Sequence, residues 1–160
     1  MYKGDGLPPL ESSVHQEFQQ RRNLQQQHSE FQQVSLIKYS GPGRTETLFH
    51  LDKHKKKDNV IEELFNDETT GGTTRTGEAI RHAVKEFANP KHGARKNAQK
   101  FIVVFTDGYS QDDPSTAADE ARRASITMLA VAINDARVPP NVEELAEITK
   151  NRNVSKVSEI

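Results

Sequence analysis

Two short loops carry side chains whose oxygen atoms could hold a hard cation. The first is the glycine- and threonine-rich segment 71–77 (GGTTRTG), and the second is 106–108 (TDG). Glycines allow the first loop to turn tightly beside another strand end. Mg²⁺, Mn²⁺ and Ca²⁺ favour carboxylate, hydroxyl and water oxygens as ligands. The threonine hydroxyls and the carboxylate of Asp107 are therefore candidate ligands of a divalent metal ion.

Asp107 directly follows an apolar run, residues 101–105 (FIVVF). Five consecutive apolar residues predict a strand buried on both faces. At the carboxyl edge of a parallel sheet, such a strand end is where ligands are commonly held. A carboxylate there is partly desolvated and needs a partner, which could be a cation, a backbone amide or a hydroxyl. Two interpretations stay open for Asp107: a metal ligand, or a carboxylate hydrogen-bonded to loop amides.

The segments around these loops predict alternating strands and helices. Gly41-Pro42-Gly43 predicts a turn between the first two strands, which then form a hairpin, and Asp58 and Ser115 could cap helices. The two hairpin strands are predicted at 34–39 and 45–51, and further strands at 126–133 and 153–158. Helices are predicted at 59–66, 76–88, 116–125 and 141–150. This alternation predicts an α/β fold, a doubly wound, mostly parallel sheet with helices on both faces.

The composition excludes several classes of protein. The chain of 160 residues has 22 basic and 23 acidic residues and a net charge of −1. That balance argues against nucleic-acid binding, which needs a concentrated basic surface. There is no cysteine, so disulfides, thiol nucleophiles and zinc–thiolate sites are excluded. No stretch predicts a membrane-spanning helix, and no signal peptide is visible in this chain.

The chain divides near residue 30. Residues 1–30 are rich in glutamine and hold few sizeable apolar side chains. They predict a poorly ordered segment, either a weakly amphipathic helix or a disordered glutamine-rich tail. Residues 31–160 carry the pattern of a folded domain.

Three stretches in this order resemble a von Willebrand factor type A (VWA) domain of the integrin-like and extracellular-matrix branch. They are VSLIKYSGPGRTETLFHL (34–51), GGTTRTGEAI (71–80) and ARKNAQKFIVVFTDGYSQDD (94–113), with ITMLAVAI (126–133) after them. The resemblance covers roughly residues 31–158 and implies a doubly wound, mostly parallel sheet surrounded by helices. It also implies that the family's first strand and last helix are missing from this chain, so the fold would need a substitute or a partner.

The resemblance further implies a metal-ion-dependent adhesion site, or MIDAS. The family motif has an aspartate-x-serine-x-serine loop, a threonine loop and a later aspartate. The second and third parts match Thr74 and Asp107. At the first part Asp5 stands at the aspartate position, but Leu7 and Pro9 occupy the serine positions and supply no hydroxyl. The ion implied is Mg²⁺ or Mn²⁺.

Other polar residues have a structural interpretation beside the functional one. Thr74 could simply cap the helix that follows it. Asp112 and Asp113 fit a helix start better than a ligand set. Asn153-Val154-Ser155 matches an N-glycosylation acceptor, with Asn153 as the modified residue. The six histidines show no metal-ligand spacing.

The resemblance implies a non-enzymatic adhesion module located outside the cell. Its partner would be a collagen, another matrix protein or another VWA domain, whose carboxylate completes the coordination of the ion. A metal-independent VWA interaction domain with a degenerate adhesion site is the alternative. A metal-dependent hydrolase is a third hypothesis, but such chemistry normally needs a second acid or base near the metal, and neither loop offers a convincing one.

Overall fold

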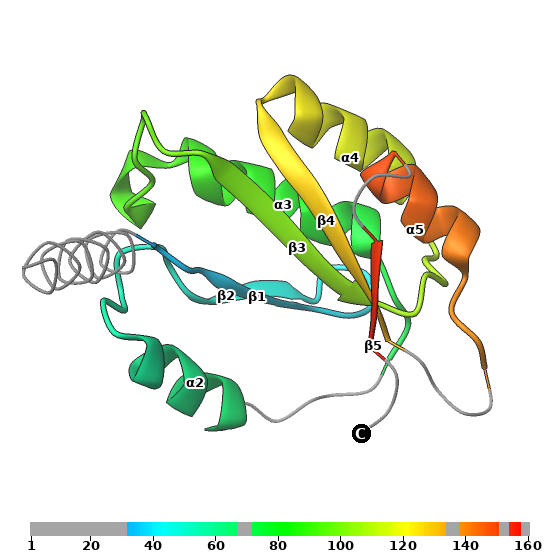
Figure 1. Cartoon of the computed structure of the whole chain (residues 1–160), viewed down its shortest axis with the longest axis horizontal. Helices are drawn as coiled ribbons and strands as arrows, with labels where there is room; N and C mark the ends of the chain where they lie inside the picture. The colour runs from blue at the N-terminus through cyan, green and yellow to red at the C-terminus, as the bar shows by residue number, and fades with distance from the viewer. Residues whose placement is uncertain (1–31, 67–71, 134–137, 151–153, 158–160) are drawn as a thin grey trace, which may run out of the picture.

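The computed structural model describes residues 32–66, 72–133, 138–150 and 154–157. Asp5, Asn153 and the predicted segment 1–30 lie outside the described residues. The described elements follow one another as shown in Figure 1: β1 (Leu36–Tyr39), β2 (Thr45–Phe49), α2 (Lys57–Asn66), α3 (Thr76–Ala88), the 3₁₀ helix η1 (Pro90–His92), β3 (Lys100–Thr106), α4 (Pro114–Arg123), β4 (Ile126–Ile133), α5 (Val142–Thr149) and β5 (Val154–Val157).

The strands form two separate sheets in the described part of the chain. β1 and β2 pair antiparallel as the predicted hairpin, whereas β3, β4 and β5 form a parallel sheet in that order. Lys100 lies opposite Ile126 and Thr106 opposite Ala132, so β3 and β4 are in register along the whole length of β3. The parallel pairing confirms the predicted alternation of strands and crossover helices.

One face of the parallel sheet carries the core. Helices α3, α4 and α5 contribute its helical side, and α4 presents only alanines there, which lets that helix pack closely. The core cluster consists of Ile80, Ala83, Ile102, Val104, Ala117, Ala118, Ala121, Ile126, Met128 and Ile148. Burial of these side chains is the main favourable term that holds the helices on the sheet.

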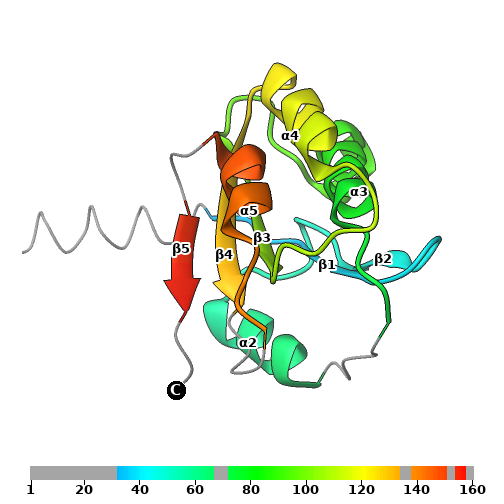
Figure 2. The same ribbon diagram turned by 90° about the vertical axis from the view of Figure 1, so that its right-hand side faces the viewer.

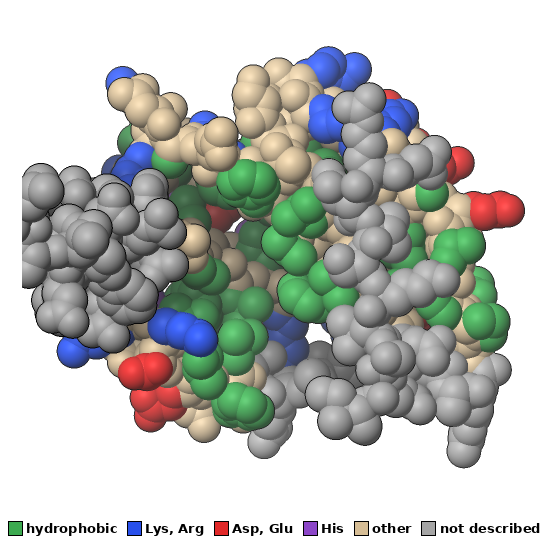
Figure 3. Space-filling view, in the orientation of Figure 1, with side chains coloured by type: hydrophobic (Ala, Val, Ile, Leu, Met, Phe, Trp, Pro, Cys, Tyr) green, Lys and Arg blue, Asp and Glu red, His purple; other side chains and the backbone are tan. Residues whose placement is uncertain are grey.

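The opposite face of β3 is exposed, so the prediction that this strand is buried on both faces is wrong for the described structure. Ile102 and Val104 point into the core, but Phe101, Val103 and Phe105 are 48%, 46% and 60% exposed. The reason is that the described helices cover β3 from one side only. Figure 3 shows hydrophobic side chains gathered around a hollow at the centre of this face.

Helix α2 lies apart from the other helices. In both views the β1–β2 hairpin runs between α3 on one side and α2 on the other (Figures 1 and 2). α2 has no buried residue, and its Ile61, Leu64 and Phe65 are exposed. No helix in the described residues is long and apolar enough to cross a membrane.

Two helix starts differ from the sequence prediction. α4 begins at Pro114, and its N-cap is Asp113 rather than Ser115, because the Asp113 carboxylate accepts a hydrogen bond from the Thr116 N–H at 3.0 Å. Proline suits the first helical position because that position needs no N–H partner. α2 begins at Lys57, which places Asp58 inside the first turn instead of at the cap.

The neighbours Val103 and Val104 offer a matched test of this one-sided packing. Val104 is 6% exposed and Val103 is 46% exposed. We expect Val104→Ala to lower the free energy of unfolding by about 2 kcal/mol and Val103→Ala by less than about 0.5 kcal/mol, measured by urea denaturation. Equal losses would show that the outer face of β3 is covered.

Candidate functional site

The glycine- and threonine-rich loop that precedes α3 (described over 72–75) is called the threonine loop, and the loop that follows β3 (107–113) is called the Asp107 loop. The two loops lie side by side at the carboxyl edge of β3. The Arg75 N–H donates to the Ser40 carbonyl at 3.1 Å, which ties the threonine loop to the end of β1. On its other side the Gln111 N–H donates to the Thr74 carbonyl at 2.8 Å. The structure therefore brings together the two loops that the sequence predicted to converge.

A shorter hydrogen bond holds the backbone carbonyl of Asp107 than the one that its carboxylate accepts. Its carbonyl accepts the Asn141 N–H at 2.8 Å, and its Oδ1 accepts the Tyr109 N–H at 3.2 Å. Gly108 has φ +82, and a Cβ there would come within 2.6 Å of the Asn141 carbonyl oxygen, so only glycine fits. Among the described residues, none donates a hydrogen bond to the second carboxylate oxygen.

Asp112 caps the first turn of α3 rather than starting its own helix. Its carboxylate accepts the N–H groups of Gly77 at 2.9 Å and Glu78 at 2.7 Å, and the hydroxyl of Ser110 at 2.6 Å. Burial alone would raise the pKa of Asp112, but these hydrogen bonds stabilise the carboxylate and hold its pKa below the usual range. A Cβ on Gly77 would lie 2.6 Å from the Asp113 carbonyl oxygen, so glycine is required for this close approach.

Glu144 belongs to the same edge, and sequence analysis missed it. The Ser110 N–H donates to its two carboxylate oxygens at 3.3 and 3.2 Å. Burial raises the pKa of Glu144, and the negative charges of Asp107 and Asp112 raise it further. The carboxylates of Asp107, Asp112 and Glu144 thus lie around one loop, and we call this place the carboxylate edge. The repulsion among their negative charges favours the binding of a cation there.

Tyr39 connects β1 to the open edge of β3. Its hydroxyl donates to the Phe105 carbonyl at 3.2 Å. Burial raises the pKa of the Tyr39 phenol, and the charges of Asp107 and Glu144 add to that rise. The phenol therefore lies close to the carboxylate cluster and stays protonated as a donor.

The structure decides between several sequence interpretations. Thr74 is not the cap of α3, because the N-cap residue is Arg75, whose side chain makes no capping hydrogen bond. Asp113 is a helix start, as predicted, whereas Asp112 serves the helix of a different segment. Thr74 and Asp107 keep their candidacy as ligands through their position at one edge.

A cleft of about 380 Å³ lies between α3 and the β1–β2 hairpin, which contributes Gly43 and Thr45 to its lining. Its walls combine cationic and anionic side chains, among them Arg75, Glu78, Arg81, His82, Lys85 and Asp112. Asp112 therefore borders both the cleft and the carboxylate edge.

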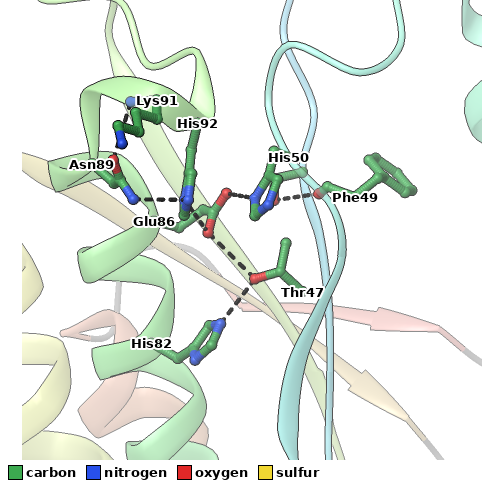
Figure 4. A network of polar contacts seen from close by, with 9 residues as sticks. Thr47, Phe49, His50, His82, Glu86, Asn89, Lys91 and His92 are labelled. Carbon is green, nitrogen blue, oxygen red and sulfur yellow. Dashed lines mark hydrogen bonds and ion pairs between the residues drawn. The ribbon is translucent and has the colours of Figure 1, made fainter.

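A second polar cluster lies at the other end of α3, and the sequence spacing did not reveal it. The carboxylate of Glu86 contacts His50 and His92, which come from separate segments of the chain (Figure 4). Only the fold brings these histidines together, because their spacing along the chain shows no metal-ligand pattern.

The family model described as "von Willebrand factor type A domain" matches residues 14–160. This chain belongs to the von Willebrand factor type A domain family. The α/β fold class predicted from the sequence is confirmed by this match and by similar solved structures. The assignment of Thr74 and Asp107 as metal ligands stays a prediction.

Two relatives of this VWA domain are adhesion or matrix proteins. The "Transmembrane cell adhesion receptor mua-3" of Caenorhabditis elegans is 34% identical over 116 residues, which cover 71% of this chain and 3% of the receptor. The "Collagen alpha-1(XII) chain" of Notophthalmus viridescens is 33% identical over 119 residues, 74% of this chain and 12% of the collagen. The VWA domain thus spans a small part of either relative.

A solved structure shows the same fold at low identity. It is "proximal thread matrix protein 1 (PTMP1) from the mussel byssus with zinc occupied MIDAS motif", with a TM-score of 0.69 and 23% identity over 79% of this chain and 32% of that one. At this identity the likeness shows that both chains share the VWA fold.

The raised pKa of Glu144 predicts a pH dependence of stability. The folded state binds the Glu144 proton more tightly than the unfolded chain, where the pKa is about 4.3. This contribution to stability is therefore fully present below about pH 4.3 and is lost as the pH rises through the folded pKa. We expect Glu144→Gln to abolish this decrease in the free energy of unfolding with rising pH, measured by urea unfolding between pH 4 and 7 in metal-free buffer.

Glu143, the exposed neighbour of Glu144 on α5, supplies the control for that measurement. Glu143→Gln removes one charge from the same turn of α5 without touching Ser110, and should keep the wild-type pH profile. A wild-type profile in Glu144→Gln would contradict the described position of this carboxylate.

Proposed function

We propose that this VWA domain is a non-enzymatic adhesion module that holds a divalent ion at Asp107 and Thr74. The observation that carries the proposal is the convergence of the threonine loop and the Asp107 loop at one carboxylate-rich edge, joined by the Gln111–Thr74 hydrogen bond of 2.8 Å. Burial is the main cause of the raised pKa of Glu144, and a cation there would relieve the repulsion from Asp107 and Asp112 that adds to it.

The donor chemistry fits a hard ion. The carboxylate of Asp107 and the hydroxyl of Thr74 are oxygen ligands of the kind that Mg²⁺ and Mn²⁺ prefer. Both ions commonly keep several waters, so a site with few protein ligands suits them. An open coordination position would then accept a carboxylate from the partner.

The partner we propose is an extracellular matrix protein, such as a collagen, or another VWA domain. The support is that the relatives are a cell adhesion receptor and a collagen chain. The same relatives support a location outside the cell. No catalytic role is proposed, because Asp112 and Glu144 are engaged by Gly77, Glu78 and Ser110 and are not free to serve as acid or base.

The cleft along α3 supports metal-independent binding as the second candidate. Arg75, Arg81 and Lys85 line it beside Glu78, so it offers charges of both signs to a polar partner surface. In that case Asp107 only braces its own loop. Binding of a matrix protein would then persist in EDTA and would weaken in Lys85→Ala.

Calorimetry with Mg²⁺ and Mn²⁺ tests the metal-dependent proposal. We expect the wild-type domain to release or absorb heat on binding one ion, and Asp107→Asn to weaken binding by at least about tenfold because it replaces the charged ligand that the described residues offer. Thr74→Ala should weaken binding less. Asp113→Asn is the matched control, because it neutralises a carboxylate of the same loop while its amide oxygen still caps α4.

Equal binding heats in the wild-type domain and Asp107→Asn would contradict the proposed ion site. Loss of binding in Asp113→Asn alone would place the ion elsewhere in the loop.

A further inference from the structure

His50, Glu86 and His92 converge at the C-terminal end of α3. His50 follows directly after β2, Glu86 lies in the last turns of α3, and His92 closes η1 (Figure 4). His50 Nδ1 lies 2.5 Å from Glu86 Oε1, and His92 Nδ1 lies 2.8 Å from Glu86 Oε2. One nitrogen or oxygen atom from each residue lies within 4.8 Å of the other two.

The carboxylate is buried while both imidazoles reach solvent. The side chain of Glu86 is 5% exposed, compared with 44% for His50 and 26% for His92. A buried carboxylate needs a compensating positive charge. Within the described chain its partners are the two histidines and the Thr47 hydroxyl at 3.3 Å, which bear no fixed positive charge.

We propose that His50, Glu86 and His92 form a binding site for a transition-metal ion of the Zn²⁺ class, separate from the edge that holds Asp107. Two imidazoles and one carboxylate are a ligand set that Zn²⁺ takes with a fourth position left open. The ion would place a fixed positive charge beside the buried carboxylate. The fourth position faces solvent and holds water.

The two shortest distances are those of hydrogen bonds, and a bound ion requires the three ligand atoms to rearrange around it. Ligand atoms around a tetrahedral Zn²⁺ lie about 3.3 Å apart, as follows from bond lengths of about 2.0–2.1 Å. The two histidine–carboxylate contacts must therefore widen by less than about 1 Å, while the most widely separated pair of ligand atoms, which lie within 4.8 Å of each other, must close toward that distance. The exposed side chain of His50 can make this movement, and the ring stack with His92, with centroids 3.9 Å apart, opens as it does so.

Surrounding residues position two of the three ligands. The Thr47 hydroxyl contacts both Glu86 and His82 Nε2, at 3.3 and 2.8 Å, and so fixes the carboxylate. Asn89 Nδ2 lies 2.8 Å from His92 Nε2, while Asn89 Oδ1 accepts the Lys91 N–H at 3.0 Å. A metal ion on His92 Nδ1 leaves the ring proton on Nε2, so the Asn89 amide must turn its oxygen toward His92 and release Lys91.

This site is distant from the carboxylate edge. Thr76 begins α3 beside Asp112, and Glu86 lies ten residues later, about 15 Å along the helix axis. The softer imidazole ligands also select different ions, since Mg²⁺ favours oxygen donors. The two sites can therefore be tested independently.

Zinc calorimetry in the presence of excess Mg²⁺ tests the proposal. We expect the wild-type domain to bind Zn²⁺, His50→Gln and His92→Gln each to bind it at least about 10-fold more weakly, and the double variant about 100-fold more weakly. Glutamine keeps an N–H that can donate to Glu86, and circular dichroism checks that each variant folds. His54→Gln is the matched control, because His54 pairs with Glu63 instead, and it should keep the wild-type affinity.

Further measurements separate this site from the edge. Asp107→Asn should bind Zn²⁺ like the wild-type domain, even if it has lost Mg²⁺ binding. On the unmodified domain, Co²⁺ should give the intense visible absorption of a tetrahedral ion, and Zn²⁺ should shift the Lys91 amide resonance. Wild-type zinc affinity in the double variant, loss of zinc binding in Asp107→Asn, or no visible Co²⁺ band would each overturn the proposal.

Discussion

The carboxylate of Asp112 at the start of α3 is the interaction on which the arrangement of the carboxyl edge depends. It accepts N–H groups of Gly77 and Glu78 that would otherwise lack partners at the helix start. Because Asp112 sits five residues beyond Asp107, this bond ties the Asp107 loop to the threonine loop. The close approach needs a residue without a side chain, and Gly77 meets that condition. The relative position of Thr74 and Asp107 is therefore set by structure, whether or not an ion is bound.

Local patterns in the sequence were sufficient to predict most elements of the fold. The helix expected at 76–88 and the strand expected at 126–133 have those same bounds in α3 and β4. The burial of β3 was not predictable from its apolar run, because Phe101 and Ile102 look alike in sequence and differ only in which side the helices cover. The start of α4 was also misplaced, since Asp113 and Ser115 are both good capping residues.

The residues of the candidate sites were also only partly predictable from the sequence. Thr74 and Asp107 could be proposed from the sequence because they match a motif with a defined order. Glu144 could not, because it reaches Ser110 from a helix 34 residues further along the chain. His50 and His92 meet only after the β1–β2 hairpin packs on α3, and Glu86 looks like an ordinary polar position of an amphipathic helix. Long-range packing carries this information, and local spacing does not.

The central claim is that a divalent ion binds where the threonine loop meets the Asp107 loop. Paramagnetic broadening by Mn²⁺ in the amide NMR spectrum tests it most directly, because broadening falls steeply with distance from the ion. We predict that the amides of 72–76 and 107–111 lose intensity first, while those near His50 and His92 keep theirs in a zinc-saturated sample. Broadening that spares both loops would contradict the account.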